Sequence, residues 1–409
     1  MDALDLEAAD PRLLLPTYHN CATMFFLRRR RILALTLGCL SCVSRAAGDD
    51  HAPFDAVDLN APAALDKVAA QLASKRVVFI GETHDRYDHH LNQLEVIRRL
   101  RELDPDIAIG VEYFPRTFQP QLDDYIAGRT TEDEFLRVSE YYKNWGYDYR
   151  LYASIFRFAR EQRIPVRPLN VPPGLASEVA KAGIAGLSEK QRVSVPSQIE
   201  PADEAYRDRL RKAFEAHKDS KPDAFEHFVE AQLVWDEGMA ETAAAYLNAN
   251  PARRLVVLAG AGHVEFGSGI PKRLERRTKA SFAILLSSGE QVEPHIADYL
   301  LLSKKQELPP AGSLGVSLEE KDGECRIRSL TVGGAAEKGG LKKGDVLVAI
   351  NRQTVGSIAD VRTVLWDKKP KDSVVVKIRE KRRFEPATER EVEIELTAPP
   401  NTGKNRPSQ

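Results

Sequence analysis

Short apolar runs alternate with amphipathic stretches through most of the chain before residue 300. Apolar residues recur at i, i+3 and i+4 in residues 89–103 and 149–163, and this spacing predicts helices. Runs rich in Val and Ile predict buried strands at residues 76–82, 106–114, 164–171, 253–263 and 280–288. Strands that alternate with helices predict an α/β fold, with a mainly parallel sheet and helices on both faces.

The same pattern divides the chain into units. The predicted α/β domain spans residues 52–300, and its stretch from Gly174 to Asn250 has no strand candidate, which indicates a helical insertion. Residues 301–312 contain a proline pair and predict a linker. A small mixed, β-barrel-like domain is predicted for residues 313–398, followed by a disordered tail at 399–409. Its short strands and one helix are predicted at 312–320, 324–330, 345–353, 373–380 and 358–366.

Residues 1–50 have the order of a targeting segment. Four arginines, Arg28 to Arg31, precede the apolar run ILALTLGCLSCV, which is too short to span a bilayer comfortably. This order predicts an exported, periplasmic or envelope-associated protein whose mature chain begins at Ala47. The sequence TLGC, which ends at Cys39, is similar to a lipoprotein box, and the sequence leaves open whether a lipid anchors the protein.

Composition narrows the class of protein. The chain has 409 residues, of which 43% are hydrophobic and 29% charged, so it is long enough for more than one globular domain. Its formal net charge of −1 provides no overall attraction to nucleic acid, and no nucleic-acid partner is predicted. Three of the four cysteines lie before residue 43, so no disulfide framework holds the fold. The arginine-rich residues 272–279 are interpreted as the solvated face of a helix.

Acidic and imidazole side chains follow three of the predicted strands. Glu82 and His84 follow the first strand, Glu112 lies at the end of the second, and His263 follows the fourth. In a parallel sheet these ends meet at one edge, where ligands bind. Two carboxylates and two imidazoles there suit a divalent metal such as Zn or Mn, or paired acid–base chemistry. A single histidine after a strand is usually a cap or a surface residue, but the repeated Gly-x-x-His favours a site.

Other polar residues have two interpretations each. His89 and His90 face either the cleft or solvent in the first turn of a helix. Gln232 and Asp236 are four residues apart and share a helix face, and Asn170 follows a strand end. Lining of a pocket and ordinary capping or core hydrogen bonding remain alternatives for these three.

The stretch VVFIGETHDRYDHHLNQLEVI resembles the haem-binding uptake family of ChaN-like proteins, which groups with the Tiki, TraB and erythromycin-esterase-like families. The resemblance continues through GVEYF, YYKNWGYDYRLYASIFRFARE and LVVLAGAGHVEFGSG, over most of residues 65–285. It implies haem binding and a role in iron acquisition. By analogy with Tiki members, Glu82, His84, Glu112 and His263 would instead hold a catalytic metal, with Glu82 or Glu112 as general base.

The resemblance does not identify a haem ligand. Ferric haem takes a phenolate, imidazole or thiolate ligand, and the aromatic stretch EYYKNWGYDYRLY offers several tyrosines. The candidates are Tyr113, Tyr141, Tyr142, Tyr147, Tyr149 and Tyr152. Aromatic residues at helical spacing are more often part of a core, and no motif selects one of them. A haem held between two protomers is consistent with the family.

Residues 313–398 resemble a bacterial PDZ domain, through SLGV, GGAAEKGGLKKGDVLVAINRQTV and SIADVRTVL. The resemblance implies that Ser313, Leu314, Gly315 and Val316 bind the C-terminal carboxylate of a partner peptide, which adds a strand to the sheet edge. Two functions follow. The first is a haem-binding protein of the bacterial envelope that docks a partner through its PDZ domain. The alternative is a metal-dependent hydrolase whose PDZ domain recruits the substrate.

Overall fold

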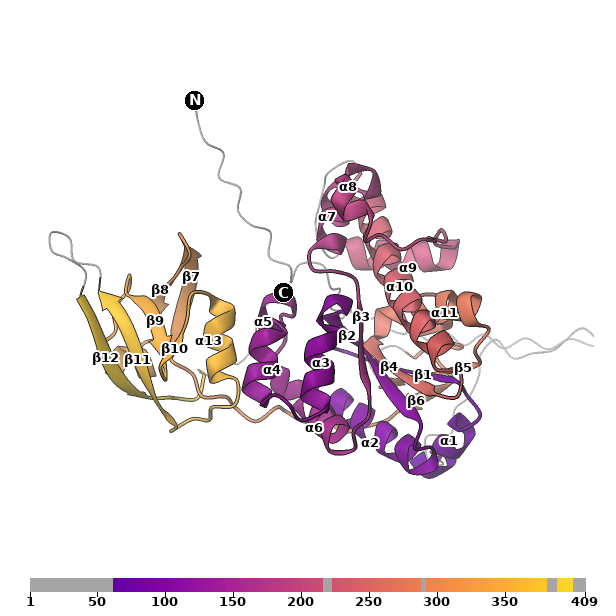
Figure 1. Cartoon of the computed structure of the whole chain (residues 1–409), viewed down its shortest axis with the longest axis horizontal. Helices are drawn as coiled ribbons and strands as arrows, with labels where there is room; N and C mark the ends of the chain where they lie inside the picture. Colours follow the sequence, from indigo (N-terminus) through magenta and orange to yellow (C-terminus); the bar gives the residue numbers. More distant parts are fainter. Residues whose placement is uncertain (1–61, 216–222, 288–291, 381–387, 400–409) are drawn as a thin grey trace, which may run out of the picture.

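The structure is a computed structural model that describes residues 62–215, 223–287, 292–380 and 388–399 (Figure 1). The predicted targeting segment and almost all of the predicted tail lie outside these residues. In the part of the chain that is described, no helix has the length and apolar character needed to cross a membrane.

The first sheet has six strands, and every neighbouring pair is parallel. Their order across the sheet is β3-β2-β4-β1-β5-β6. The strands are β1 (Val77–Glu82), β2 (Ile107–Pro115), β3 (Val166–Asn170), β4 (Arg254–Gly260), β5 (Phe282–Ser287) and β6 (Tyr299–Leu301). The predicted α/β class and its first five strands are confirmed. The sixth strand is not among the predictions because it is short and only half-buried at the sheet edge.

Helices cover both faces of this sheet because side chains alternate along each strand. In β1, Val78 and Ile80 belong to the core under α2 (Tyr87–Leu103) and α6 (Ala153–Glu161). Val77 and Phe79 pack on the opposite side, where α10 and α11 lie. The remaining helices before β3 are α1 (Leu65–Leu72), α3 (Gln119–Ile126), α4 (Glu132–Val138) and α5 (Tyr141–Asn144).

The stretch from Gly174 to Asn250 is helical, and its described residues include no strand. It contains α7 (Leu175–Ala182), α8 (Glu189–Arg192), α9 (Glu204–Glu215) and α10 (Ala224–Ala249). The elements α7 and α8 project beyond the end of the sheet, whereas α10 returns along its face (Figure 1). The predicted insertion therefore includes the helix that crosses from β3 to β4.

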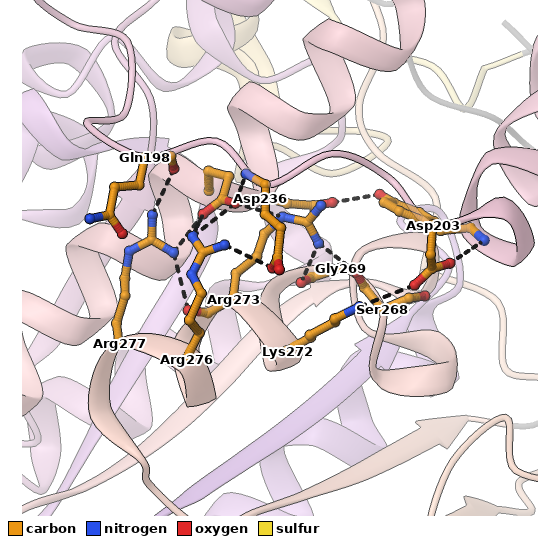
Figure 2. Close-up of polar contacts among 12 residues, drawn as sticks. Gln198, Asp203, Asp236, Ser268, Gly269, Lys272, Arg273, Arg276 and Arg277 are labelled. Atoms are coloured by element: carbon orange, nitrogen blue, oxygen red, sulfur yellow. Dashed lines mark hydrogen bonds and ion pairs between the residues drawn. The ribbon is translucent and has the colours of Figure 1, made fainter.

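Helix α11 (Ile270–Thr278) binds the insertion through arginines. The Glu237 carboxylate on α10 is fully buried and forms ion pairs with Arg273 at 3.3 Å, Arg276 at 2.8 Å and Arg277 at 2.5 Å. Arg277 also donates to the carbonyl oxygen of Gln198 (Figure 2). Only 2% of Arg273 is exposed. The interpretation of residues 272–279 as a solvated face is therefore wrong for this arginine, because a buried carboxylate requires compensating charge.

The second sheet is antiparallel and has the order β12-β11-β9-β8-β7, with β10 paired to β9. Its elements are β7 (Val316–Lys321), β8 (Glu324–Leu330), α12 (Ala335–Lys338), β9 (Val346–Ile350), β10 (Gln353–Thr354), α13 (Ile358–Leu365), β11 (Ser373–Glu380) and β12 (Thr388–Glu395). This confirms a small second domain. Strand β12 is not among the predictions because only Val392 and Ile394 in it are apolar.

Candidate functional site

The four predicted site residues lie around Gly260, where the three central strands end. Glu82 is the last residue of β1 and is the register partner of Gly260 on β4. Glu112 lies on β2, and its carboxylate accepts a hydrogen bond from the Gly260 N–H at 2.7 Å. His84 and His263 lie on the turns that follow β1 and β4. The parallel register therefore brings all four residues to one sheet edge.

Their side chains form two buried hydrogen-bonded groups. The Nδ1 of His84 lies 2.6 Å from Glu82 Oε1. The Nε2 of His263 lies 3.5 Å from Glu112 Oε1, and its Nδ1 lies 2.7 Å from Asp236 Oδ1 on α10. Asp236 also accepts the hydroxyl hydrogen of Tyr206 on α9 at 2.5 Å.

The two histidines are stabilised as cations by these carboxylates. Burial alone lowers the pKa of His263, but Glu112 and Asp236 raise it to about 10. Burial lowers the pKa of His84 as well, but Glu82 together with Glu112 more than offsets this, so that its pKa is raised. Glu112 shows the opposite shift: burial raises its pKa, but His263, His84 and the Gly260 N–H lower it to about 2. The site is a buried network in which three carboxylates, from Glu82, Glu112 and Asp236, face two imidazoles.

The donor arrangement does not favour a divalent metal. Among the residues that the structure describes, no three His, Cys, Asp or Glu side chains are placed to hold one metal ion. Glu82 and Glu112 are each hydrogen-bonded within a different group, to His84 and to the Gly260 N–H respectively. The described residues therefore give no support to a Zn or Mn ion at this site.

The neighbouring polar residues have structural roles. His89 accepts the Thr83 N–H at Nδ1, and burial together with Arg86 lowers its pKa to about 4. His90 is fully buried and its Nε2 lies 3.0 Å from the carbonyl oxygen of His84. The alternative of a solvated first turn is therefore wrong for both histidines. Asn170 donates to the carbonyl oxygen of Glu112.

The two residues predicted to share a face of α10 differ in what they contact. Asp236 orients His263, so it belongs to the site. Gln232 is also buried, and its amide nitrogen has no hydrogen-bond partner among the described residues. Tyr206 is not among the predicted residues, since it lies thirty positions before Asp236 and no short spacing connects them.

An aromatic pair lies over His84. The ring centroid of Trp145 is 5.0 Å from that of His84, and the ring of Tyr147 is 4.9 Å away. Tyr147 is only partly buried, and its hydroxyl has no hydrogen-bond partner among the described residues. The other five candidate tyrosines are at most 8% exposed. Tyr147 is thus the least buried of the six candidate tyrosines.

Replacing Gly260 by Ala is expected to disturb this site. A Cβ at Gly260 would lie 2.8 Å from Cε1 of His84 and 3.1 Å from its Nε2. Such overpacking costs about 1–3 kcal/mol, measurable as a lower free energy of unfolding in urea. Gly262→Ala is the matched control, because a Cβ there meets nothing within 4 Å. Equal stability of the two variants would contradict the packing around Gly260.

The pKa of His263 predicts a pH dependence of stability. Its pKa rises from 6.5 in the unfolded chain to about 10, so its stabilising contribution is complete below pH 6.5 and is lost as pH rises toward 10. We expect the free energy of unfolding to decrease more between pH 7 and pH 9 in the wild type than in His263→Gln. His89→Gln serves as control, because a histidine with a pKa of about 4 is already neutral. A wild-type slope equal to that of His263→Gln would contradict the assignment.

Comparison with known families gives two matches. Residues 68–274 match the model of a family described as haem-binding uptake, Tiki superfamily, ChaN, and residues 312–396 match that of the PDZ domain. No curated protein matches the chain.

Solved structures with similar folds include relatives of both domains. ChaN of Campylobacter jejuni, described with cofacial haem binding, is 16% identical, with a TM-score of 0.47, over 57% of this chain and 90% of that one. An erythromycin esterase is 15% identical, with a TM-score of 0.35, over 54% and 72% of the two chains. The peptide-bound PDZ domain of a Vibrio cholerae carboxy-terminal protease is 24% identical, with a TM-score of 0.19, over 22% and 96%.

Proposed function

The chain belongs to the ChaN-like haem-binding uptake family of the Tiki superfamily, and from this membership we propose that it binds haem through the phenol of Tyr147. The observation that carries the proposal is the position of this side chain. It reaches solvent, has no hydrogen-bond partner among the described residues, and lies against the ring of His84. Ferric haem accepts a phenolate as an axial ligand.

Nearby carboxylates affect the ionisation of Tyr147. Burial, together with the charges of Glu82 and Asp85, raises the pKa of Tyr147 above its usual value. The phenol therefore keeps its proton unless a positive centre approaches it. His84, held by Glu82, borders the phenol on one side, and Trp145 adds an aromatic surface 5.6 Å from the Tyr147 ring.

The other parts of the proposed function rest on the sequence. The basic and apolar order of residues 28–43 supports export to the bacterial envelope, with Cys39 as the position for a lipid anchor. The PDZ domain docks the C-terminal peptide of a partner through residues 313–316. If Tyr147 held the haem at this partly exposed position, a second protomer would complete its cover.

Haemin titration tests the proposal. The purified chain is titrated with haemin while the Soret band is followed, beside matched albumin and buffer controls. We expect saturable, stoichiometric binding with the spectrum of a phenolate-ligated ferric haem. Size-exclusion chromatography with light scattering then compares the mass of the free and loaded protein, and a doubled mass supports the two-protomer arrangement. The absence of saturable, specific binding would refute the haem-binding proposal.

A further inference from the structure

The PDZ domain has an open groove beside its edge strand. Strand β7 ends the second sheet, so its outer edge has no strand neighbour in the described chain. A cavity of about 430 Å³ lies between β7, α13 and the loop before β7. The first domain also lines this cavity, with Tyr142 on α5 and Asp148 in the following turn.

These two residues are held in place by contacts between the domains. Arg362 on α13 lies 4.4 Å over the ring of Tyr142 and donates to the carbonyl oxygen of Gly146. Asp148 pairs with Arg150 at 2.6 Å. Arg150 also donates to the carbonyl oxygen of Pro309 at 2.7 Å, in the segment that joins the domains.

Trp366 strengthens the same interface at the end of α13. Its Nε1 donates to Asp133 on α4 at 2.6 Å, and its ring lies 5.2 Å from that of Tyr149. Helix α13 lies next to α5 in the whole chain (Figure 1). The side of the groove that the first domain forms is therefore held in place by packing between the two domains.

The lining of the groove favours one chemical class of ligand. Leu314, Val316, Val361 and Leu365 provide an apolar pocket, which suits an apolar last side chain. Gly315 has a φ of +69°, a conformation that turns the loop and that glycine adopts without strain. The guanidinium of Arg362 in the lining complements a terminal carboxylate, and the open edge of β7 pairs with an extended backbone.

We propose that this groove is a two-domain peptide site, in which Tyr142 and Asp148 of the α/β domain contact the peptide together with the PDZ loop and α13. The ligand is a partner peptide with a free C-terminus and an apolar last residue. The inference rests on the proposed function of the PDZ domain in docking such peptides. The segment that contributes this wall also carries Trp145 and Tyr147, so the peptide site and the haem site share one stretch of chain.

Photo-crosslinking to the full chain tests the two-domain site. An array of short synthetic peptides with free carboxylates and randomised last residues identifies the tightest binder, and its amidated form is the control. That peptide then carries a benzophenone near its C-terminus. Trypsin cuts after Lys143 and Arg150, so labelling of Asp148 is found on the fragment 144–150.

The outcomes separate the inference from the function on which it rests. Label on the PDZ domain together with fragment 138–143, which holds Tyr142, or fragment 144–150, which holds Asp148, supports the two-domain site if excess unlabelled peptide abolishes it. Label confined to residues 313–366 overturns it but leaves peptide docking intact. No binder in the array overturns both.

A charge variant provides a second measurement. The substitution Asp148→Ala eliminates a carboxylate that repels the terminal carboxylate of the peptide. It also removes the partner of Arg150, whose charge can then attract the peptide. We expect the peptide to bind about threefold more tightly. The matched control is Asp124→Ala on α3, which removes a comparable surface carboxylate that pairs with Arg129. Equal affinities of the two variants would overturn the proposal. Tighter peptide binding after removal of residues 400–409 would also overturn it, because that segment would then be the occupant of the groove.

Discussion

Replacing Tyr147 by Phe is expected to lower haem affinity by more than about a hundredfold, since even changes beside a metal ligand cost about 10–100-fold. The substitution removes one oxygen and keeps the ring that packs on His84 and Trp145. The fold should be unaffected, because the hydroxyl has no partner among the described residues that would lose a hydrogen bond. The measurement is a haemin titration followed by the Soret band, together with the spectrum of the bound species.

Two further variants make this test specific. Tyr299→Phe lies on the edge strand β6 and removes a hydroxyl that donates to Gln71. This variant should bind haem like the wild type. Tyr113→Phe removes a buried hydroxyl without a partner, and it tests a phenol that haem cannot reach. If Tyr147→Phe keeps wild-type affinity and spectrum, Tyr147 is not the ligand, and a loss in Tyr113→Phe would then point to that buried phenol instead.

Replacing Asp236 by Ala is expected to lower the free energy of unfolding by about 3–5 kcal/mol, because it breaks a buried ion pair and leaves its partner charged. Asp236 is fully buried, and it contacts both Nδ1 of His263 and the hydroxyl of Tyr206. Without it, His263 retains only Glu112, and the Tyr206 hydroxyl loses its acceptor. Urea unfolding followed by far-ultraviolet circular dichroism measures the loss.

The matched controls for Asp236 differ in burial and in charge. Asp203→Ala removes a half-exposed partner of Lys272 and the acceptor of the Tyr206 N–H at the start of α9, which together should cost about 1–2 kcal/mol. Asp236→Asn keeps a hydrogen-bonding side chain but removes the charge, so it should lie between the wild type and Asp236→Ala. A loss in Asp236→Ala as small as that in Asp203→Ala would show that this pair does not stabilise the site.

Several features of the fold follow from local patterns in the sequence. Strands β1, β2, β4 and β5 contain continuous apolar runs that include Val or Ile, because a parallel sheet buries both faces, whereas the edge strand β3 is only partly buried. Strands β6 and β12 have no such run. In β12, charged residues alternate with Val392 and Ile394 because one face of that edge strand contacts water. Pattern-based prediction therefore succeeds most clearly for strands that are buried on both faces, and it fails for the short β6 and the charge-rich β12.

The candidate site divides in the same way. Glu82, His84, Glu112 and His263 could be predicted to share one edge, since each follows a recognisable strand. The burial of His89 and His90 could not be predicted, because nothing in the sequence of a helix's first turn shows whether that turn faces solvent or protein. Arg273 is a comparable case, since only the position of Glu237 on α10 makes its burial stable.

Residue order alone is sufficient to establish the parallel α/β sheet, the PDZ domain after it and the convergence of acidic and imidazole groups at the strand ends, because periodicity and strand direction are local properties of the chain. The choice of Tyr147 among six tyrosines, the link from Tyr206 through Asp236 to His263, and the contribution of Tyr142 and Asp148 to the PDZ groove depend on folding. These features arise from burial and from contacts between distant segments, and neither leaves a spacing that can be read along the sequence.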